Sequence, residues 1–236
     1  MGQLVHTLPE GPAVAGVTLL AGEIYLVRDK ECDQVEVYDV NTRRLRRCIT
    51  VPNIRSMTNM TSCEHCRCVY IGDRIVKCVH RLDVRGATTR WTVNDEPAGL
   101  SVNAAHNVLV TCHEVRKIKE FSSHGDLLRE LTLPDDVITP WHAIQTRSGQ
   151  FIVCHGYRDD PVHRVCMISA DGCRIVHSHG GQRGSGTDQF NVPGHLAVEL
   201  DDNDFVFVVD MNNHRVKLLS PTLEYVRTVV SPTLLK

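Results

Sequence analysis

A short segment rich in β-branched and aromatic residues recurs along this 236-residue chain. Its central residues are Leu26, Ile71, Val110, Val153 and Val208, so that the steps between them are 45, 39, 43 and 55 residues. Each segment is too short for a helix, is rich in strand-forming residues and is followed by polar turn residues. This recurrence predicts a repeat protein built from small β units.

Three further series of strand-like segments keep the same period, one before each central segment and two after it. In the last unit they are Pro193–Val198, His214–Leu218 and Tyr225–Val229. Four short strands in a unit of about 45 residues are typical of a β-propeller blade. A single blade exposes two apolar faces, which only neighbouring blades can cover. We therefore expect an all-β propeller of four-stranded blades, forming one domain over residues 1–236.

The predicted blade boundaries leave one segment over. The five blades are expected at about residues 10–52, 53–94, 95–134, 135–180 and 190–232. Residues 2–9 look like a separate outer strand, because their glycine, leucines and closing proline match the segment from Gly125 to Pro134. We therefore expect five complete blades plus one orphan outer strand, in an incomplete or irregularly closed six-bladed ring.

Composition excludes several classes of protein. Apolar residues make up 42% and charged residues 23% of the chain, which is ordinary globular usage and excludes wholesale disorder. The net charge of −2 gives no chain-wide attraction to nucleic acid or to an anionic membrane. No apolar run approaches the roughly 18 residues of a membrane span. Several of the ten cysteines lie in apolar runs, which favours buried thiols in a reducing, cytoplasmic setting.

The most specific motif lies near the C-terminal end. A glycine-rich approach from Gly180 ends in Gln-Phe, a strand starts at Pro193, and an acidic turn at Asp210 leads to Asn213–Val216. This pattern resembles the NHL repeat, with the best match over residues 180–220. The resemblance implies a six-bladed propeller that binds protein or RNA, as in the tripartite-motif/NHL proteins. It also implies substrate recognition in a ubiquitin-ligase-like protein, although no RING, B-box or coiled-coil pattern accompanies it here.

Two pairs of residues have spacings found in metal sites. His142 and His195 each stand second after a proline at the start of an inner strand, and inner strands line a propeller's channel. The lyases related to the NHL family hold metal there, but a catalytic zinc needs three protein ligands. The alternative is a histidine hydrogen-bonded to a neighbouring blade.

Cys63 and Cys66 have the Cys-x-x-Cys spacing without a second ligand pair. A metal-dependent lyase or hydrolase is therefore an alternative function, with no catalytic residue or cofactor assigned.

The turns expected on one face of the propeller carry seven cations and thirteen acids, a net charge of −6. RNA binds through its phosphates to basic surfaces, so this face favours a protein partner over RNA. Trp141, Tyr157 and Arg158 are predicted on turns and belong to the residue types that anchor interfaces. Together with His142 and His195 they are the candidate partner-binding residues. The sequence thus predicts a non-enzymatic binding module, with RNA binding as an alternative.

Other recurring features are interpreted as structural. The stretch 180–186 lacks the Lys-Ser/Thr that a phosphate loop requires, so it is predicted to be a long turn between blades. The basic run at residues 43–47 is expected at a solvated outer edge. His80, His163 and His214 recur with the repeat and are predicted to pack between blades.

Overall fold

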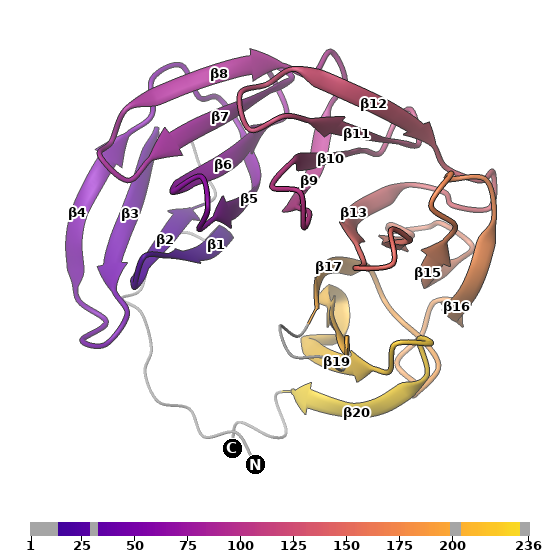
Figure 1. The fold of residues 1–236 in the computed structure, drawn as a ribbon. Coiled ribbons are helices and arrows are strands. Elements are labelled where there is room, and N and C mark those ends of the chain that lie inside the picture. Colours follow the sequence, from indigo (N-terminus) through magenta and orange to yellow (C-terminus); the bar gives the residue numbers. More distant parts are fainter. Residues whose placement is uncertain (1–13, 29–32, 199–203, 232–236) are drawn as a thin grey trace. The chain divides into compact units, whose positions relative to one another are not determined.

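The computed structural model describes residues 14–28, 33–198 and 204–231. Over these residues the chain is all-β, with twenty strands and one turn of 3-10 helix, η1, at Met211–Asn213 (Figure 1). Consecutive strands pair in groups of four, which gives five four-stranded sheets. In the described part of the chain no helix is long and apolar enough to cross a bilayer. The expected β-propeller of four-stranded blades is confirmed.

The blades follow one another in chain order. Blade 1 contains β1 (Val14–Leu20), β2 (Glu23–Arg28), β3 (Gln34–Asp39) and β4 (Leu45–Thr50). Blade 2 contains β5 (Met57–Cys63), β6 (Cys68–Asp73), β7 (Cys78–Asp83) and β8 (Thr88–Thr92). Blade 3 contains β9 (Pro97–Val102), β10 (Val108–Cys112), β11 (Lys117–Phe121) and β12 (Leu127–Thr132).

Blade 4 contains β13 (Pro140–Gln145), β14 (Phe151–His155), β15 (His163–Ile168) and β16 (Ile175–Gly181). Blade 5 contains β17 (Pro193–Val198), β18 (Val206–Asp210), β19 (Arg215–Leu219) and β20 (Tyr225–Val230). The described residues form the five complete blades that the sequence predicted, fewer than the six of the ring that the NHL resemblance implied. The orphan strand expected at residues 2–9 lies outside the described residues.

The chain divides into two compact units, and the division falls inside blade 3. The N-terminal unit contains the described residues 14–28, 33–112 and 120–129. The C-terminal unit contains residues 113–119, 130–198 and 204–231. Within the N-terminal unit, β1 packs beside β5 and β5 beside β9; within the C-terminal unit, β13 packs beside β17.

Burial follows the order of strands within each blade. The second strands β6, β10 and β14 are buried along their whole length, because sheets cover both of their faces. The fourth strand β12 is exposed at every position except Leu131. Polar groups buried near the ends of the second strands must therefore find partners inside the blade.

Candidate functional site

The three residues predicted to anchor a partner come together in the C-terminal unit. The rings of Trp141, on β13, and Tyr157, in the loop between β14 and β15, lie edge to face with centroids 4.8 Å apart. The guanidinium of Arg158 lies 4.9 Å from the centre of the Tyr157 ring. On the other side of Trp141, the imidazole of His113 stacks in parallel at 5.7 Å. We call these four residues the aromatic cluster.

The loop that carries Tyr157 and Arg158 is held by its own hydrogen bonds. The backbone N–H of Tyr157 donates to Asp160 Oδ2 at 2.7 Å, and the N–H of Asp160 donates to the Tyr157 carbonyl at 2.9 Å. Arg183 Nη1 donates to the carbonyl of Arg158 at 2.8 Å. Gly156 begins the loop at a φ of 103°, where a Cβ would overlap a backbone oxygen of the same loop. The loop therefore presents the Arg158 side chain, which is exposed, from a fixed backbone.

Sequence reasoning missed His113, the fourth member of the aromatic cluster. It follows β10 directly, outside the strand pattern that guided the search. The sequence could have indicated it, because His113 lies in the turn between the second and third strands of its blade, as Tyr157 does. Trp141 Nε1 and His113 Nδ1 are buried and have no hydrogen-bond partner among the described residues.

His142 and His195 lie next to each other, as predicted from their equivalent places. Their ring centroids are 5.3 Å apart. His142 Nδ1 accepts the backbone N–H of Leu196 at 3.3 Å, which is the predicted hydrogen bond to a neighbouring blade. Burial lowers the pKa of His195. Among the described residues, no third histidine, cysteine, aspartate or glutamate lies close enough to share a metal ion with this pair.

Cys63 ends β5 and Cys66 lies in the turn between β5 and β6, and among the described residues no third ligand lies close enough to share a metal ion with them. Cys63 pairs with Cys68 across the two strands, and the backbone N–H of Cys66 donates to Cys63 Sγ at 3.4 Å. Burial raises the pKa of the Cys63 thiol to about 11. No described cysteine is joined in a disulfide.

A buried polar group that the sequence analysis did not predict recurs from blade to blade. We call it the blade triplet. It consists of the last residue of the second strand, the residue paired with it on the third strand, and the residue two positions further on. The triplet is Asp73, Cys78 and His80 in blade 2, His155, Arg164 and Cys166 in blade 4, and Asp210, Arg215 and Lys217 in blade 5.

In blade 5 the triplet is an ion pair with an additional cation. Asp210, fully buried, accepts hydrogen bonds from the backbone N–H of Asn191 at 2.7 Å and from Arg215 Nε at 2.8 Å. Lys217, also fully buried, donates to three backbone carbonyls in the loop between β16 and β17, at 2.6 to 3.2 Å. Its ammonium lies 4.4 Å from the centre of the Phe190 ring. The loop between β16 and β17 is thus fastened through its carbonyls. The turn predicted over 180–186 begins only after Gly181, because Gly180 and Gly181 end β16.

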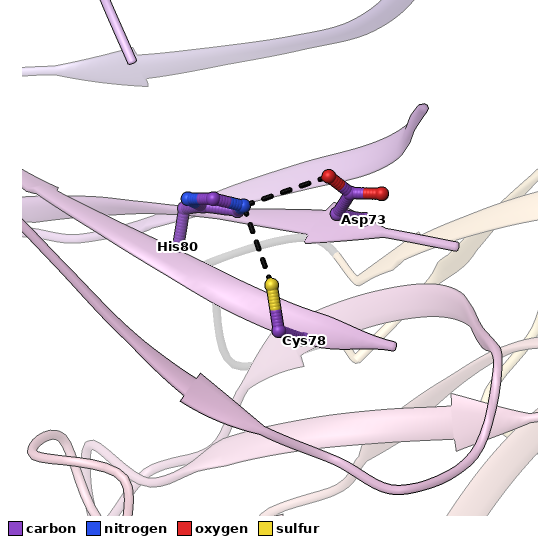
Figure 2. A group of neighbouring side chains, drawn as sticks. All are labelled: Asp73, Cys78 and His80. Carbon is purple, nitrogen blue, oxygen red and sulfur yellow. Dashed lines mark hydrogen bonds and ion pairs between the residues drawn. The ribbon is translucent and has the colours of Figure 1, made fainter. Parts of the chain in front are cut away.

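In blade 2 the same positions hold a carboxylate, a thiol and an imidazole (Figure 2). His80 Nε2 lies 3.3 Å from Cys78 Sγ and 3.6 Å from Asp73 Oδ2. Burial raises the pKa of the Cys78 thiol to about 11, and the nearby Asp73 adds to this shift. Burial lowers the pKa of His80, and Asp73 opposes that shift. All three residues are at most 2% exposed.

The predicted role of the three recurring histidines holds only in part. His80 and His163 are buried, but His214 is exposed. The strand register also separates them: His163 and His214 immediately precede the residues paired with His155 and Asp210, whereas His80 lies two positions beyond the residue paired with Asp73. The His-Arg dipeptide that these three segments share therefore occupies one position in blades 4 and 5 and a different position in blade 2.

No family model matches the chain, and no curated protein is similar to it in sequence. Solved structures are similar to it in fold. A streptogramin B lyase gives a TM-score of 0.68 at 12% identity over 93% of this chain and 69% of that chain. Virginiamycin B lyase from Staphylococcus aureus gives 0.66 at 12% identity, over 93% and 70%. A protein of unknown function from Bacteroides caccae gives 0.68 at 16% identity, over 96% and 85%. At these identities the similarity shows the β-propeller fold.

Proposed function

We propose that this propeller is a binding module whose C-terminal unit holds a protein partner at the aromatic cluster. The observation that carries the proposal is the row of ring contacts from His113 through Trp141 and Tyr157 to the exposed Arg158. Tryptophan, tyrosine and arginine are the side chains that most often dominate the binding energy of protein interfaces.

The cluster is organised before any partner arrives. Each ring rests on the next, and the bond from Arg183 fixes the backbone of Arg158. Binding therefore costs little side-chain ordering entropy, which otherwise takes about 0.5–1.5 kcal/mol for each immobilised flexible side chain. A partner would offer an apolar ring to Trp141 and a carboxylate or carbonyl oxygen to Arg158.

Exposed charges lie close in sequence to members of the cluster, since Asp159 follows Arg158 and Arg116 is three residues from His113. Asp159 lies 3.8 Å from Arg183, and Asp135 lies 2.8 Å from Arg116. Such rim charges contribute to orientation and association rate more than to affinity. On the NHL resemblance, the partner is a substrate recruited by a ubiquitin-ligase-like protein.

Two alternative functions, RNA binding and a lyase activity, have weaker support. Bases of RNA could stack on the same rings, but the exposed acids beside them oppose phosphate binding. Two proteins of similar fold are lyases, but a lyase site at His142 and His195 would need a third ligand that the described residues do not supply. The protein-binding function therefore has the strongest support.

The test compares two variants with the wild-type chain. Tyr157→Ala/Arg158→Ala removes the outer half of the cluster and leaves Trp141 packed against the core. The control, Arg43→Ala/Arg44→Ala, removes exposed charge from the basic run in the N-terminal unit. Proteins captured by cross-linking are quantified by mass spectrometry, and the leading partner is then purified and titrated.

We expect the purified partner to bind the wild-type chain and the control equally, and the cluster variant at least about tenfold more weakly, which is about 1.4 kcal/mol. Equal binding by all three proteins would show that the partner does not bind at this cluster. Binding to single-stranded RNA that falls steeply with salt, and is lost in the cluster variant, would replace the protein partner with RNA.

A further inference from the structure

Asp73 is a buried carboxylate in a triplet that contains no lysine or arginine. In blade 5, Arg215 Nε donates to Asp210 at 2.8 Å and Lys217 follows two positions later. In blade 2 those two positions hold Cys78 and His80. The nearby Arg90 acts to lower the pKa of Cys78 and of His80, but among the described residues no lysine or arginine side chain bonds to Asp73. Burying a charge without an opposite charge is costly, so Asp73 calls for a cation.

The backbone fixes the carboxylate and leaves one oxygen directed at the imidazole. Asp73 Oδ1 accepts the backbone N–H groups of Ser56, Ile75 and Val76 at 3.1–3.3 Å. Oδ2 accepts a single N–H, from Arg55, at 2.6 Å, and is the oxygen nearest to His80 Nε2. Outer hydrogen bonds of this kind orient a carboxylate that binds metal.

The two distances from His80 Nε2 to the other donor atoms fit a common metal ion, and all three donor atoms lie within 4.8 Å of one another. Zinc bonds to sulfur at about 2.3 Å and to histidine nitrogen or carboxylate oxygen at about 2.0–2.2 Å, in a tetrahedral arrangement. Those bond lengths place sulfur and nitrogen about 3.5 Å apart, and nitrogen and oxygen about 3.4 Å apart. The structure has 3.3 Å from Cys78 Sγ to His80 Nε2 and 3.6 Å from His80 Nε2 to Asp73 Oδ2.

The same geometry argues against a nucleophilic triad. In a Cys-His-Asp triad the thiol meets one ring nitrogen and the carboxylate holds the other. Here both Cys78 and Asp73 face Nε2 of His80, as Figure 2 shows. One nitrogen cannot relay a proton between two groups that share it, whereas one nitrogen beside a thiol and a carboxylate is a metal-ligand arrangement.

The site has an entry path. A cavity of about 250 Å³ is lined by Val76, Cys78, Arg90, Trp91 and Thr92. It therefore borders Cys78 from the side of β8, whereas Asp73 is fully buried and does not line it. A cavity of this volume has room for the water that would complete a zinc site with three protein ligands.

We propose that blade 2 binds one zinc ion through Asp73 Oδ2, Cys78 Sγ and His80 Nε2. Binding releases the thiol proton to solvent, so that the thiolate and the carboxylate together neutralise the two charges of the ion. The fourth position faces the cavity. This site lies in the N-terminal unit and does not depend on the aromatic cluster.

The test starts from the full chain stripped of metal with a chelator. Zinc is titrated in, and cobalt is used as a spectroscopic substitute. We expect one zinc per chain, and with cobalt a near-ultraviolet charge-transfer band from the thiolate. Cys78→Ser and His80→Gln should each weaken zinc binding at least about 100-fold, which is the upper end of the loss expected for a residue that only hydrogen-bonds to a metal ligand.

Two matched controls separate this site from the other thiols. Cys166→Ser removes a buried thiol 3.5 Å from His155 in a triplet that has no carboxylate. Cys63→Ser/Cys66→Ser removes the Cys-x-x-Cys pair. Both controls should keep the zinc and the cobalt band.

A further measurement covers the case in which Cys78→Ser does not fold. In the wild-type chain, zinc should slow alkylation of Cys78 and leave that of Cys66 unchanged, as followed by peptide mass spectrometry. Absence of stoichiometric zinc binding, loss of zinc with the Cys63/Cys66 control, or alkylation of Cys78 at the same rate with and without zinc would overturn the proposal.

Discussion

Blade 2 and blade 5 solve one structural problem with different chemistry. Their triplets have the same spacing, with a residue five positions after the aspartate and another two positions later. Asp73 accepts the backbone N–H of Arg55, and Asp210 accepts that of Asn191, each two residues before the first strand of its blade. Both aspartates thus tie the incoming segment to the second strand. Only blade 5 supplies lysine and arginine in the triplet.

Blade 4 shows that the last residue of the second strand can bond to the segment preceding the blade without being an aspartate. Its equivalent residue, His155, donates from Nδ1 to the carbonyl of Ile138 at 3.1 Å, again two residues before the first strand. Its Nε2 accepts Arg164 Nε at 3.0 Å. The bond to the incoming segment is therefore what the fold requires. The charge of the group that makes it can vary as long as the blade balances that charge locally.

In blade 3 the triplet positions hold two cations and no carboxylate, which is the reverse of blade 2. Spacing places Lys117 and Lys119 at its two basic positions, after Cys112. Both lysines bond to Glu130 on β12, at 2.7 and 3.0 Å, so the outer strand supplies the missing carboxylate. In blade 2 the triplet keeps the carboxylate and has lost the cations. The missing cations of blade 2 are the reason for proposing a metal ion at Asp73.

The largest effect is expected from breaking the blade 5 pair. Arg215→Met leaves Asp210 fully buried without its cation and releases the loop carbonyls that Arg215 holds. Breaking a buried pair from one side costs about 3–5 kcal/mol. We expect that loss in urea unfolding followed by tryptophan fluorescence. Arg227→Met, an exposed position on β20, should change stability by less than about 0.5 kcal/mol.

If the two variants unfold at the same urea concentration, the blade 5 triplet does not stabilise the fold through its ion pair. The comparison with blade 2 would then carry no information about a missing cation.

Blade 4 should respond to acid. Burial and the neighbouring Arg164 lower the pKa of His155 to about 4, below its ordinary value of 6.5. The unfolded chain then takes up the proton first, so stability is lost as the pH falls from 6.5 towards 4. At 1.36 kcal/mol for each pKa unit, the loss reaches about 3 kcal/mol.

The measurement is the urea midpoint at pH 7 and at pH 4.5 for the wild-type chain and for His155→Gln. Glutamine can keep both hydrogen bonds but takes up no proton, so the variant should lose less stability on acidification. His124→Gln, at an exposed histidine, serves as the control and should behave as the wild type. An acid response of His155→Gln equal to that of the wild type would place the titrating group elsewhere.

The strands were predictable because burial sets their pattern. Pro193–Val198 was predicted with the bounds that the structure has, since a proline starts this inner strand and an apolar run fills it. The first strand of blade 2, Met57–Cys63, follows a different pattern. Its polar residues, such as Asn59, hide the strand from a search for apolar runs.

The candidate site was only partly predictable. Trp141, Tyr157 and Arg158 were found because their residue types stand out in turns. The blade triplets were missed because the hairpins were aligned by the His-Arg letters, which placed His80 beside His163 instead of beside Lys217. Counting five residues from each aspartate would have aligned Cys78 with Arg215. Which donor atoms converge on His80 Nε2 depends on side-chain geometry, which spacing alone does not contain.

The smallest effect, and the most direct test of the comparison, comes from giving blade 2 the triplet of blade 5. Cys78→Arg/His80→Lys places a guanidinium beside Asp73, and the cavity that Cys78 lines offers room for the longer side chain. Hydrogen bonds to charged groups contribute about 1.5–3 kcal/mol. Because desolvating the new cations offsets part of that, we expect the metal-free variant to gain about 1.5 kcal/mol over the metal-free wild type.

Zinc distinguishes a repaired charge balance from a general gain in stability. Zinc should raise the melting temperature of the wild-type chain, because an ion that binds only the folded state stabilises it, and should leave the double variant unchanged. Cys166→Ser should respond to zinc as the wild type does. A double variant that is less stable than the metal-free wild type would mean that Asp73 needs no counterion, because the four backbone N–H groups already satisfy it. Blade 2 would then differ from blade 5 in packing alone.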